Sequence, residues 1–228
     1  MEKEENPFEE PIVAQEWIHA VEYDKDGSRD AEIYPLLLDW ITKISPQVTV
    51  EVGAGQGICS SKINLTAGKY IGVEPSEPLV HRAKELYPET NKVFLIGSAY
   101  NLPVENEMAD AVFSVGVWFH LQDLDAAAQE VARVLKSGGK VMIVTSNPEK
   151  DHVWESFFDG ERVGNLLHGS VRLPAGTVSK NTFYLHSEDD VVSSLRKAGL
   201  SVLSIEKFGV GKRLEGDKIW MAVEGVKD

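Results

Sequence analysis

The feature that most constrains the fold is an alternation of helix-like and strand-like segments, which begins at Ile33 and runs almost to the end of the chain. Residues 31–44 place apolar side chains at helical spacing, and residues 48–52 then form a short apolar run typical of a buried strand. Alternating helices and strands predict a mostly parallel sheet with helices on both faces. The predicted fold class is therefore α/β, with a doubly wound, Rossmann-like sheet.

The same pattern gives the number of strands and the direction of the last one. Strands are expected at 48–52, 70–73, 93–96, 110–115, 141–144, 200–206 and 218–224. Helices are expected at 31–44, 58–65, 79–86, 124–135 and 188–195, and Gly138-Gly139 should stop the fourth of them. The connection before the last strand is too short for a crossover helix, so the last two strands should pair antiparallel. We expect a seven-stranded, mostly parallel sheet that ends in a C-terminal antiparallel hairpin.

Two segments do not follow this alternation. Residues 1–30 hold ten acidic and three basic side chains, which is typical of a solvated terminus but also fits a lid over the site. Residues 147–186 show no clear period, and connections longer than about 12 to 15 residues are usually lids or small insertions. We expect one domain at 31–228, in which 147–186 is a substrate-covering insertion.

Composition excludes several classes of function. The chain has 36 acidic and 23 basic residues, a formal net charge of -13, which would repel a nucleic-acid backbone. The single cysteine, Cys59, rules out an internal disulfide and fits a reducing, cytoplasmic setting, and with the scattered histidines it gives no metal site. The sequence has no apolar run of about 18 residues, so membrane insertion is not expected, and the acidic start is unlike a secretory leader.

The most informative motif is a glycine-rich turn, Glu51-Val-Gly-Ala-Gly-Gln-Gly57, between a strand and a helix. Glycines let the backbone turn tightly and approach a ligand, and the start of a helix presents unpaired N–H groups. Glu74 ends the next strand, at the position where an acidic side chain of this fold accepts hydrogen bonds from ribose hydroxyls. The turn therefore predicts a nucleoside-containing cofactor.

Glycine spacing separates two classes of such cofactors. Dinucleotides prefer G-x-G-x-x-G/A, whereas here the bulky Ile58 follows Gly57. Glu51 would also repel a pyrophosphate but attract a ligand that carries an ammonium and a sulfonium group. S-adenosylmethionine fits this description better than NAD(P), although an NAD(P)-dependent oxidoreductase remains the alternative enzyme.

Five motifs in order resemble those of the class I S-adenosylmethionine-dependent methyltransferases, in particular the small-molecule branch that includes ubiquinone/menaquinone C-methyltransferases. The motifs are Glu51 to Gly57, Val73-Glu-Pro75, Gly97 to Pro103, Asp110 to Leu121 and Ala132 to Gly139. The resemblance implies a methyltransferase that uses S-adenosyl-L-methionine, releases S-adenosyl-L-homocysteine and methylates a small-molecule acceptor. It would act by in-line displacement, mainly through positioning and desolvation. A non-catalytic S-adenosylmethionine-binding protein is the other alternative.

The resemblance also assigns cofactor-binding residues. In it the glycines approach the methionine part, Glu74 holds the ribose, Ser98 and Ala99 flank the adenine, and the main chain of Val115 meets the methionine amino group. The family usually has an acidic residue at the position of Ser98, and a hydroxyl there is the weaker acceptor. The full set implied is Glu51, Gly53, Ala54, Gly55, Gln56, Gly57, Glu74, Pro75, Ser98, Ala99 and Val115.

The acceptor side is less defined by the sequence. His120 follows the fourth strand and is the candidate general base, because imidazole titrates near neutral pH; a packing or capping role is the alternative. Aromatic residues near the site would suit an apolar or planar acceptor, although core packing explains them equally well. These substrate or lid candidates are Trp17, Tyr23, Tyr34, Trp118, Trp154, Phe157 and Phe158.

Overall fold

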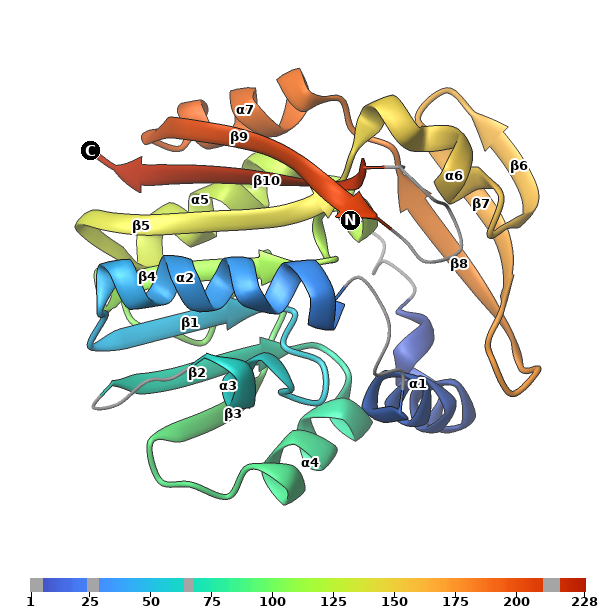
Figure 1. Cartoon of the computed structure of the whole chain (residues 1–228), viewed down its shortest axis with the longest axis horizontal. Coiled ribbons are helices and arrows are strands. Elements are labelled where there is room, and N and C mark those ends of the chain that lie inside the picture. Colours follow the sequence, from blue (N-terminus) through green and yellow to red (C-terminus); the bar gives the residue numbers. More distant parts are fainter. Residues whose placement is uncertain (1–5, 24–28, 64–67, 211–217) are drawn as a thin grey trace.

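The computed structural model describes residues 6–23, 29–63, 68–210 and 218–228 and shows a seven-stranded sheet in the order β3-β2-β1-β4-β5-β10-β9 (Figure 1). The first five of these strands run parallel, and β10 pairs antiparallel with both β5 and β9. The predicted fold class and the terminal hairpin are confirmed. The strands are β1 (Val48–Val52), β2 (Lys69–Glu74), β3 (Lys92–Ile96), β4 (Ala109–Val115), β5 (Leu135–Ser146), β9 (Leu200–Val210) and β10 (Lys218–Lys227).

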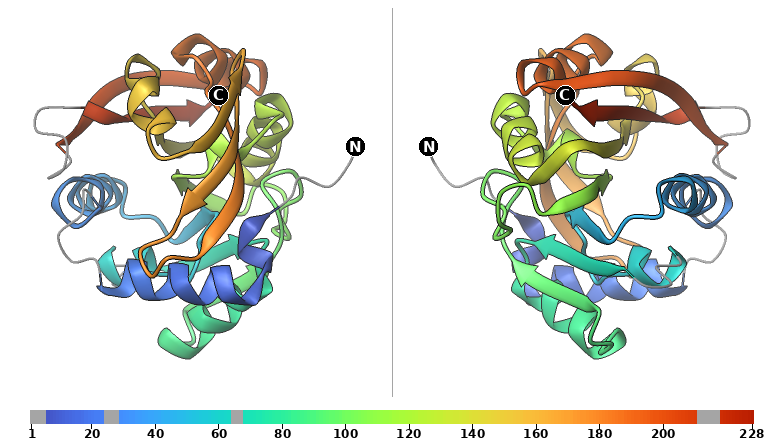
Figure 2. Two further views of the ribbon diagram at one scale, coloured as in Figure 1. Left: turned by 90° about the vertical axis from the view of Figure 1, so that its right-hand side faces the viewer. Right: turned by 90° about the vertical axis from the view of Figure 1, so that its left-hand side faces the viewer.

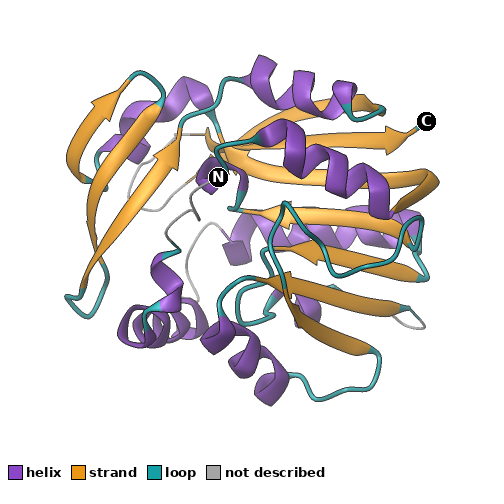
Figure 3. Cartoon of the chain, turned by 180° about the vertical axis from the view of Figure 1, so that it is seen from behind, coloured by secondary structure: helices purple, strands orange, loops and turns teal. Residues whose placement is uncertain are grey.

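Helices cover both faces of the sheet, as Figures 1 and 3 show from opposite sides. One face carries α2 (Tyr34–Ile44), α3 (Cys59–Lys62) and α4 (Glu77–Leu86), and the other carries α5 (Leu124–Val134) and α7 (Glu188–Lys197). Each face encloses its own buried cluster, built around Phe113 and Trp220 on the first side and around Val112 and Met221 on the second. This alternation follows from the strand period of two. No helix among the described residues is long and apolar enough to cross a membrane.

Two expected helix boundaries are wrong. The predicted helix 58–65 is only the short α3, and residues 64–67 lie outside the described part of the chain. The glycine pair does not stop α5, because that helix ends at Val134 and Gly138 and Gly139 lie inside β5. The N–H groups of Glu107 and Met108 donate to the last helical carbonyls at 2.9 Å, so no glycine cap is needed.

The segment without a clear period, 147–186, folds into structure that its sequence pattern did not predict. After η4 (Pro148–Lys150) and the short helix α6 (Asp151–Glu155), it forms an antiparallel sheet of β6 (Asp159–Val163), β7 (Leu166–Arg172) and β8 (Val178–Tyr184). Where β6 and β7 pair, Gly160 lies opposite Gly169, and a Cβ on either would meet backbone at 2.7 Å or less. Two β-strands can therefore approach closely in a stretch rich in polar residues.

Before the sheet, the N-terminal segment forms η1 (Pro7–Glu9), α1 (Pro11–Tyr23) and the single turn η2 (Arg29–Ile33). Val13 and Ala14 on α1 are buried, so this part of the acidic segment is packed and not merely solvated. In Figure 2, left, α1 and the β7–β8 hairpin lie across the edge of the sheet at which β1, β2 and β4 end. Ligands of open α/β sheets bind at this carboxyl edge.

Candidate functional site

The glycine-rich turn leaves β1 and folds back against β2. The N–H groups of Gly53 and Ala54 both donate to the Val73 carbonyl, at 2.8 and 3.0 Å. A Cβ on Gly53 would lie 2.1 Å from a methyl group of Val117, so a side chain is excluded there. Gly55, with φ +54°, has no atom within 4 Å of its Cβ position. The turn thus keeps its backbone accessible at Gly55 and packs tightly elsewhere.

Glu74 ends β2 directly beside this turn. Its carboxylate accepts hydrogen bonds from the Gly55 N–H at 3.0 Å and from the Ser76 N–H at 2.9 Å, one on each oxygen. Burial raises the pKa of Glu74 to about 7, against the lowering effect of the two N–H donors, and the side chain is 6% exposed. Each oxygen keeps a second lone pair. Glu74 therefore holds the loop and can still accept hydrogen bonds from a ligand.

The residues expected around the adenine lie next to Glu74. The Gly97 N–H donates to the Glu74 carbonyl at 3.2 Å, which places the start of the β3–β4 connection beside the end of β2. Ser98 forms an isolated bridge with Asn101, Ala99 is buried, and Pro75 is exposed. The structure therefore brings both predicted adenine neighbours to the carboxyl edge that holds Glu74.

Glu51 differs from the free negative charge that the sequence suggested. Its carboxyl accepts a hydrogen bond from the Tyr70 hydroxyl and another from the Cys59 thiol, in the core under α3. Complete burial raises the pKa of Glu51 to about 8, so the group is mostly protonated at neutral pH. Its contribution is to support the strand from which the turn departs.

Gln56 also has a different partner from the one expected. Its side chain is buried and donates to the Ile18 carbonyl of α1 at 3.3 Å. The Ser76 hydroxyl donates to the Phe8 carbonyl at 2.5 Å, and Arg82 of α4 donates to both oxygens of Glu22 at 2.9 Å. The N-terminal segment is thus fastened along the same edge that carries the glycine turn and Glu74.

At the end of β4, His120 occupies an apolar environment. Its ring lies 4.7 Å from the rings of both Phe119 and Phe183. Burial lowers the pKa of His120 to about 4, although the Thr182 backbone raises it slightly by hydrogen bonding. A group with that pKa is a weak base at neutral pH, so this geometry matches the packing alternative better than general-base catalysis.

An aromatic cluster surrounds this position, and it contains three of the predicted substrate or lid residues. Phe119 of η3 (Trp118–His120) lies 5.2 Å from Trp154 and 4.6 Å from Phe183, and Trp154 lies 5.1 Å from Trp220. A Cβ on Gly116, the residue after β4, would lie within 4 Å of both Phe119 and Trp220. We call this set the aromatic cluster: Phe119, His120, Trp154, Phe157, Phe158, Phe183 and Trp220.

Sequence reasoning missed three members of the aromatic cluster. Phe119 follows β4 and Trp220 lies near the start of β10, and their position at the carboxyl edge could have suggested them. Phe183 lies in β8, which the sequence pattern did not reveal. Val115, the last residue of β4, pairs with Val144 of β5. The aromatic cluster lies just beyond this end of the strand.

Other predicted lid residues lie elsewhere. Trp118 is 1% exposed and packs in the core against α5, so its assignment to a lid is wrong. Tyr34 is buried at the start of α2, under the ammonium group of Lys62, and is likewise a core residue. Trp17 of α1 packs on Phe8 with the Arg29 guanidinium over its ring. The side chain of Tyr23 lies outside the described residues.

The two covering segments are joined by Glu16 of α1. Its carboxylate accepts hydrogen bonds from the Ala175 and Thr177 N–H groups, at the tip of the β7–β8 hairpin, and the residue is 8% exposed. The Thr177 side chain and these N–H groups lower the pKa of Glu16 below its usual value. The carboxylate therefore clasps two segments that lie about 160 residues apart in the chain.

One cavity, of about 640 Å³, lies between the second half of α2 and the beginnings of β4 and β5. It is lined by Trp40, Lys43, Asp110 and Glu224, among others. These strands begin there and end at the opposite edge, so the cavity is remote from Glu74 and the aromatic cluster. Among the described residues no group of His, Cys, Asp and Glu could hold a metal ion.

Comparisons with known proteins relate the chain to methyltransferases. Residues 50–143 match the family model of a methyltransferase domain. The chain is 28% identical over 120 residues to an uncharacterized methyltransferase of Mycobacterium tuberculosis, covering 53% of this chain and 48% of that one. It is 27% identical to the tRNA U34 carboxymethyltransferase of Cellvibrio japonicus, over 80% of this chain and 54% of that one. It spans about half the length of these curated relatives.

Two further comparisons cover more of the other protein. The ubiquinone biosynthesis O-methyltransferase of Hydrogenovibrio crunogenus is 27% identical, over 78% of this chain and 74% of its own. The solved structure of an S-adenosylmethionine-dependent methyltransferase from Mesorhizobium loti superposes with a TM-score of 0.63 at 14% identity, over 89% of this chain and 99% of that one, which shows a shared fold. The match of residues 50–143 to a methyltransferase domain and the fold shared with this structure both agree with the resemblance seen in the sequence.

Proposed function

We propose that the chain is a class I S-adenosylmethionine-dependent methyltransferase and that it methylates a small, planar and largely apolar acceptor. The observation that carries the proposal is the meeting, at one carboxyl edge, of a carboxylate with spare lone pairs, an accessible glycine backbone and an aromatic cluster. Glu74 and Gly55 form the polar half of this arrangement. The aromatic cluster, beside Gly116, forms the apolar half.

The residues fit the cofactor on three counts. Open space beside Gly55 lets a ligand approach the backbone, the spare lone pairs of Glu74 can accept from ribose hydroxyls, and Ser98 and Ala99 stand beside Glu74 for the adenine. When bound, S-adenosylmethionine supplies a methyl group on a sulfonium, which is already a good leaving group. What the chain must add is orientation and exclusion of water.

The two covering segments suit those needs. The Glu16 clasp joins α1 to the β7–β8 hairpin across the edge of the sheet, and Gln56 ties the glycine turn to α1. A site covered in this way separates the reacting atoms from water. It also favours a small acceptor over a macromolecule, because a bulky substrate would have to displace both segments.

Charge supports the same choice of acceptor. One relative is named as acting on tRNA and another belongs by name to ubiquinone biosynthesis, so the relatives alone do not select between them. The net charge of -13 opposes binding of a phosphate backbone. With the pKa of His120 lowered to about 4, this imidazole is a weak base at neutral pH, so we expect positioning and not general-base catalysis to carry the mechanism.

Calorimetric titration with S-adenosylmethionine, S-adenosylhomocysteine and NAD tests the cofactor, and transfer of a labelled methyl group to a panel of planar small molecules tests the acceptor. We expect binding of the two adenosyl ligands without NAD, followed by label in at least one low-molecular-weight product. Binding of NAD alone would support the oxidoreductase alternative. Adenosyl binding with label only in added tRNA would overturn the small-molecule proposal.

A further inference from the structure

Two polar atoms on α6 are buried without a hydrogen-bond partner. Within the described part of the chain, the indole nitrogen Nε1 of Trp154 and the carboxylate oxygen Oδ1 of Asp151 are both shielded from solvent and unpaired. An unsatisfied buried polar group costs about 1 to 3 kcal/mol, so native proteins rarely keep two in one short helix. A bound ligand could supply both missing partners.

The neighbours of the Trp154 indole place it on the acceptor side of the site. It is 8% exposed and its ring contacts Phe119, Phe183 and Trp220 of the aromatic cluster, next to the end of β4. Phe157, which packs edge-on against Trp154, is 46% exposed and marks where the cluster reaches solvent. The unpaired N–H is therefore the polar part of an otherwise aromatic environment.

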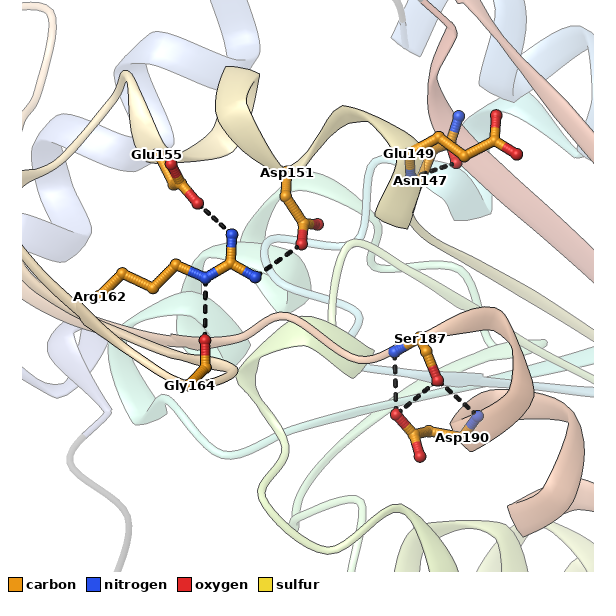
Figure 4. A network of polar contacts seen from close by, with 8 residues as sticks. All are labelled: Asn147, Glu149, Asp151, Glu155, Arg162, Gly164, Ser187 and Asp190. Carbon is orange, nitrogen blue, oxygen red and sulfur yellow. Dashed lines mark hydrogen bonds and ion pairs between the residues drawn. The ribbon is translucent and has the colours of Figure 1, made fainter.

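Asp151 is held in place by one oxygen and unpaired at the other. Arg162 donates to Oδ2 at 3.1 Å, and the same guanidinium pairs with Glu155 and donates to the Gly164 carbonyl, as Figure 4 shows. This network fixes the side chain and neutralises part of its charge, while Oδ1 remains an acceptor. Burial raises the pKa of Asp151 above its usual value, against the effect of Arg162.

The two residues share one side of α6. Asp151 and Trp154 are three residues apart in α6, and residues at this spacing lie on the same side of a helix. One offers only a donor, and the other, when ionised, only an acceptor. A single group that both accepts and donates a hydrogen bond satisfies both, and a hydroxyl group is the simplest such group.

We propose that Trp154 and Asp151 bind a hydroxyl group of the methyl acceptor, with the indole N–H donating to its oxygen and Asp151 Oδ1 accepting its proton in a hydrogen bond. The acceptor is then a planar hydroxy compound, a phenol or an enol, whose ring contacts the aromatic cluster. This inference rests on the proposed function and narrows its substrate class. It makes Trp154 and Asp151 specificity residues.

Three related probes test the pair on protein saturated with S-adenosylhomocysteine: 2-naphthol, 2-methoxynaphthalene and naphthalene. We expect 2-naphthol to bind about tenfold more tightly than naphthalene, the effect of one to two hydrogen bonds, with 2-methoxynaphthalene between them. The indole N–H resonance of Trp154 is assigned by its loss in Trp154→Phe. It should shift downfield when 2-naphthol binds, because the N–H then donates to the oxygen of the probe, and should not shift downfield in this way with naphthalene. Equal affinity for 2-naphthol and naphthalene, or no binding of any probe, would overturn the inference.

Variants separate recognition from a structural effect. Trp154→Phe should weaken 2-naphthol about fivefold and leave naphthalene unchanged, and Asp151→Asn should weaken 2-naphthol but not 2-methoxynaphthalene. Glu155→Gln is the matched control, because it disturbs the same Arg162 network without touching Oδ1. If Glu155→Gln weakens 2-naphthol binding as much as Asp151→Asn does, the loss comes from the Arg162 network, and the proposed role of Trp154 and Asp151 is refuted.

Failure of the proposed function has a different signature. If S-adenosylhomocysteine itself does not bind, the cofactor assignment is wrong, and the probes are then titrated on the protein alone. Binding of S-adenosylhomocysteine without any preference for a hydroxyl group leaves the methyltransferase proposal intact and rejects only the Trp154–Asp151 pair.

Discussion

Cofactor affinity should depend on the ionisation of Glu74. Only the carboxylate form offers acceptors at both oxygens for ribose hydroxyls, and its pKa in the free protein is about 7. About one tenth of the protein is then ionised at pH 6 and about nine tenths at pH 8. The dissociation constant of S-adenosylhomocysteine should therefore be about tenfold larger at pH 6 than at pH 8, a difference of about 1.4 kcal/mol.

Calorimetry at pH 6, 7 and 8 and constant ionic strength measures this dependence, with Glu74→Gln as the control. The amide cannot ionise, so the variant should bind weakly with a nearly flat profile, and any titration of the ligand itself appears in both proteins. A flat profile in the unaltered protein, or the same slope in the variant, would refute the role given to Glu74.

The pH dependence of the free energy of unfolding gives an independent check on Glu74. The pKa of Glu74 in the folded protein lies above the value of 4.5 expected after unfolding, so folding favours the protonated form. The contribution to stability is present below pH 4.5 and is lost as the pH rises through about 7, by about 3 kcal/mol. Denaturant unfolding without ligand should show that Glu74→Gln lacks this loss.

Three further predictions concern the turn, the clasp and the histidine. Gly55→Ala should lower affinity for S-adenosylhomocysteine at least tenfold, whereas Gly138→Ala, which also has a positive φ and open space, should leave calorimetric affinity unchanged; equal losses would exclude a ligand contact at Gly55. Glu16→Gln should speed amide exchange at Ala175, because the amide group no longer provides two charged acceptors, and unchanged exchange would show that the clasp does not hold the hairpin. His120, with its pKa lowered to about 4, should stay neutral from pH 8 down to pH 5.5 in an NMR titration, and an inflection near pH 6.5 would contradict its burial. Because the folded protein favours the neutral ring, His120 should lower the free energy of unfolding only as the pH falls from 6.5 toward 4.

The sheet was predictable because its signals are local. A strand such as Val48–Val52 carries its apolar run in consecutive residues, and Ser187 and Asp190 carry both halves of a capping box, which the structure contains. The position of Glu74 beside the glycine turn likewise follows from strand order in this fold. These elements could be read without knowing any distant contact.

The contacts between the two covering segments were not predictable, because they join residues far apart in the chain. Glu16 meets Ala175 across 159 positions of the chain, and no periodicity in either segment announces that contact. Trp118 illustrates the related difficulty that an aromatic residue after a strand can turn toward the core or toward the ligand. In the structure Trp118 turns toward the core, where it shares a buried cluster with Leu124 and Ala127 of α5.

The three-stranded sheet that covers the edge has little interior of its own. All five residues of β6 are exposed, β7 buries only Leu167, and the buried side chains of β8 are the polar Ser179 and Asn181. Apart from Leu167 and the contacts of Phe183 with the aromatic cluster, this layer buries little apolar surface, so its free energy of local opening should lie below that of the seven-stranded sheet. A bound aromatic molecule would complete the missing interior, and part of its affinity would be consumed in ordering the segment that encloses it.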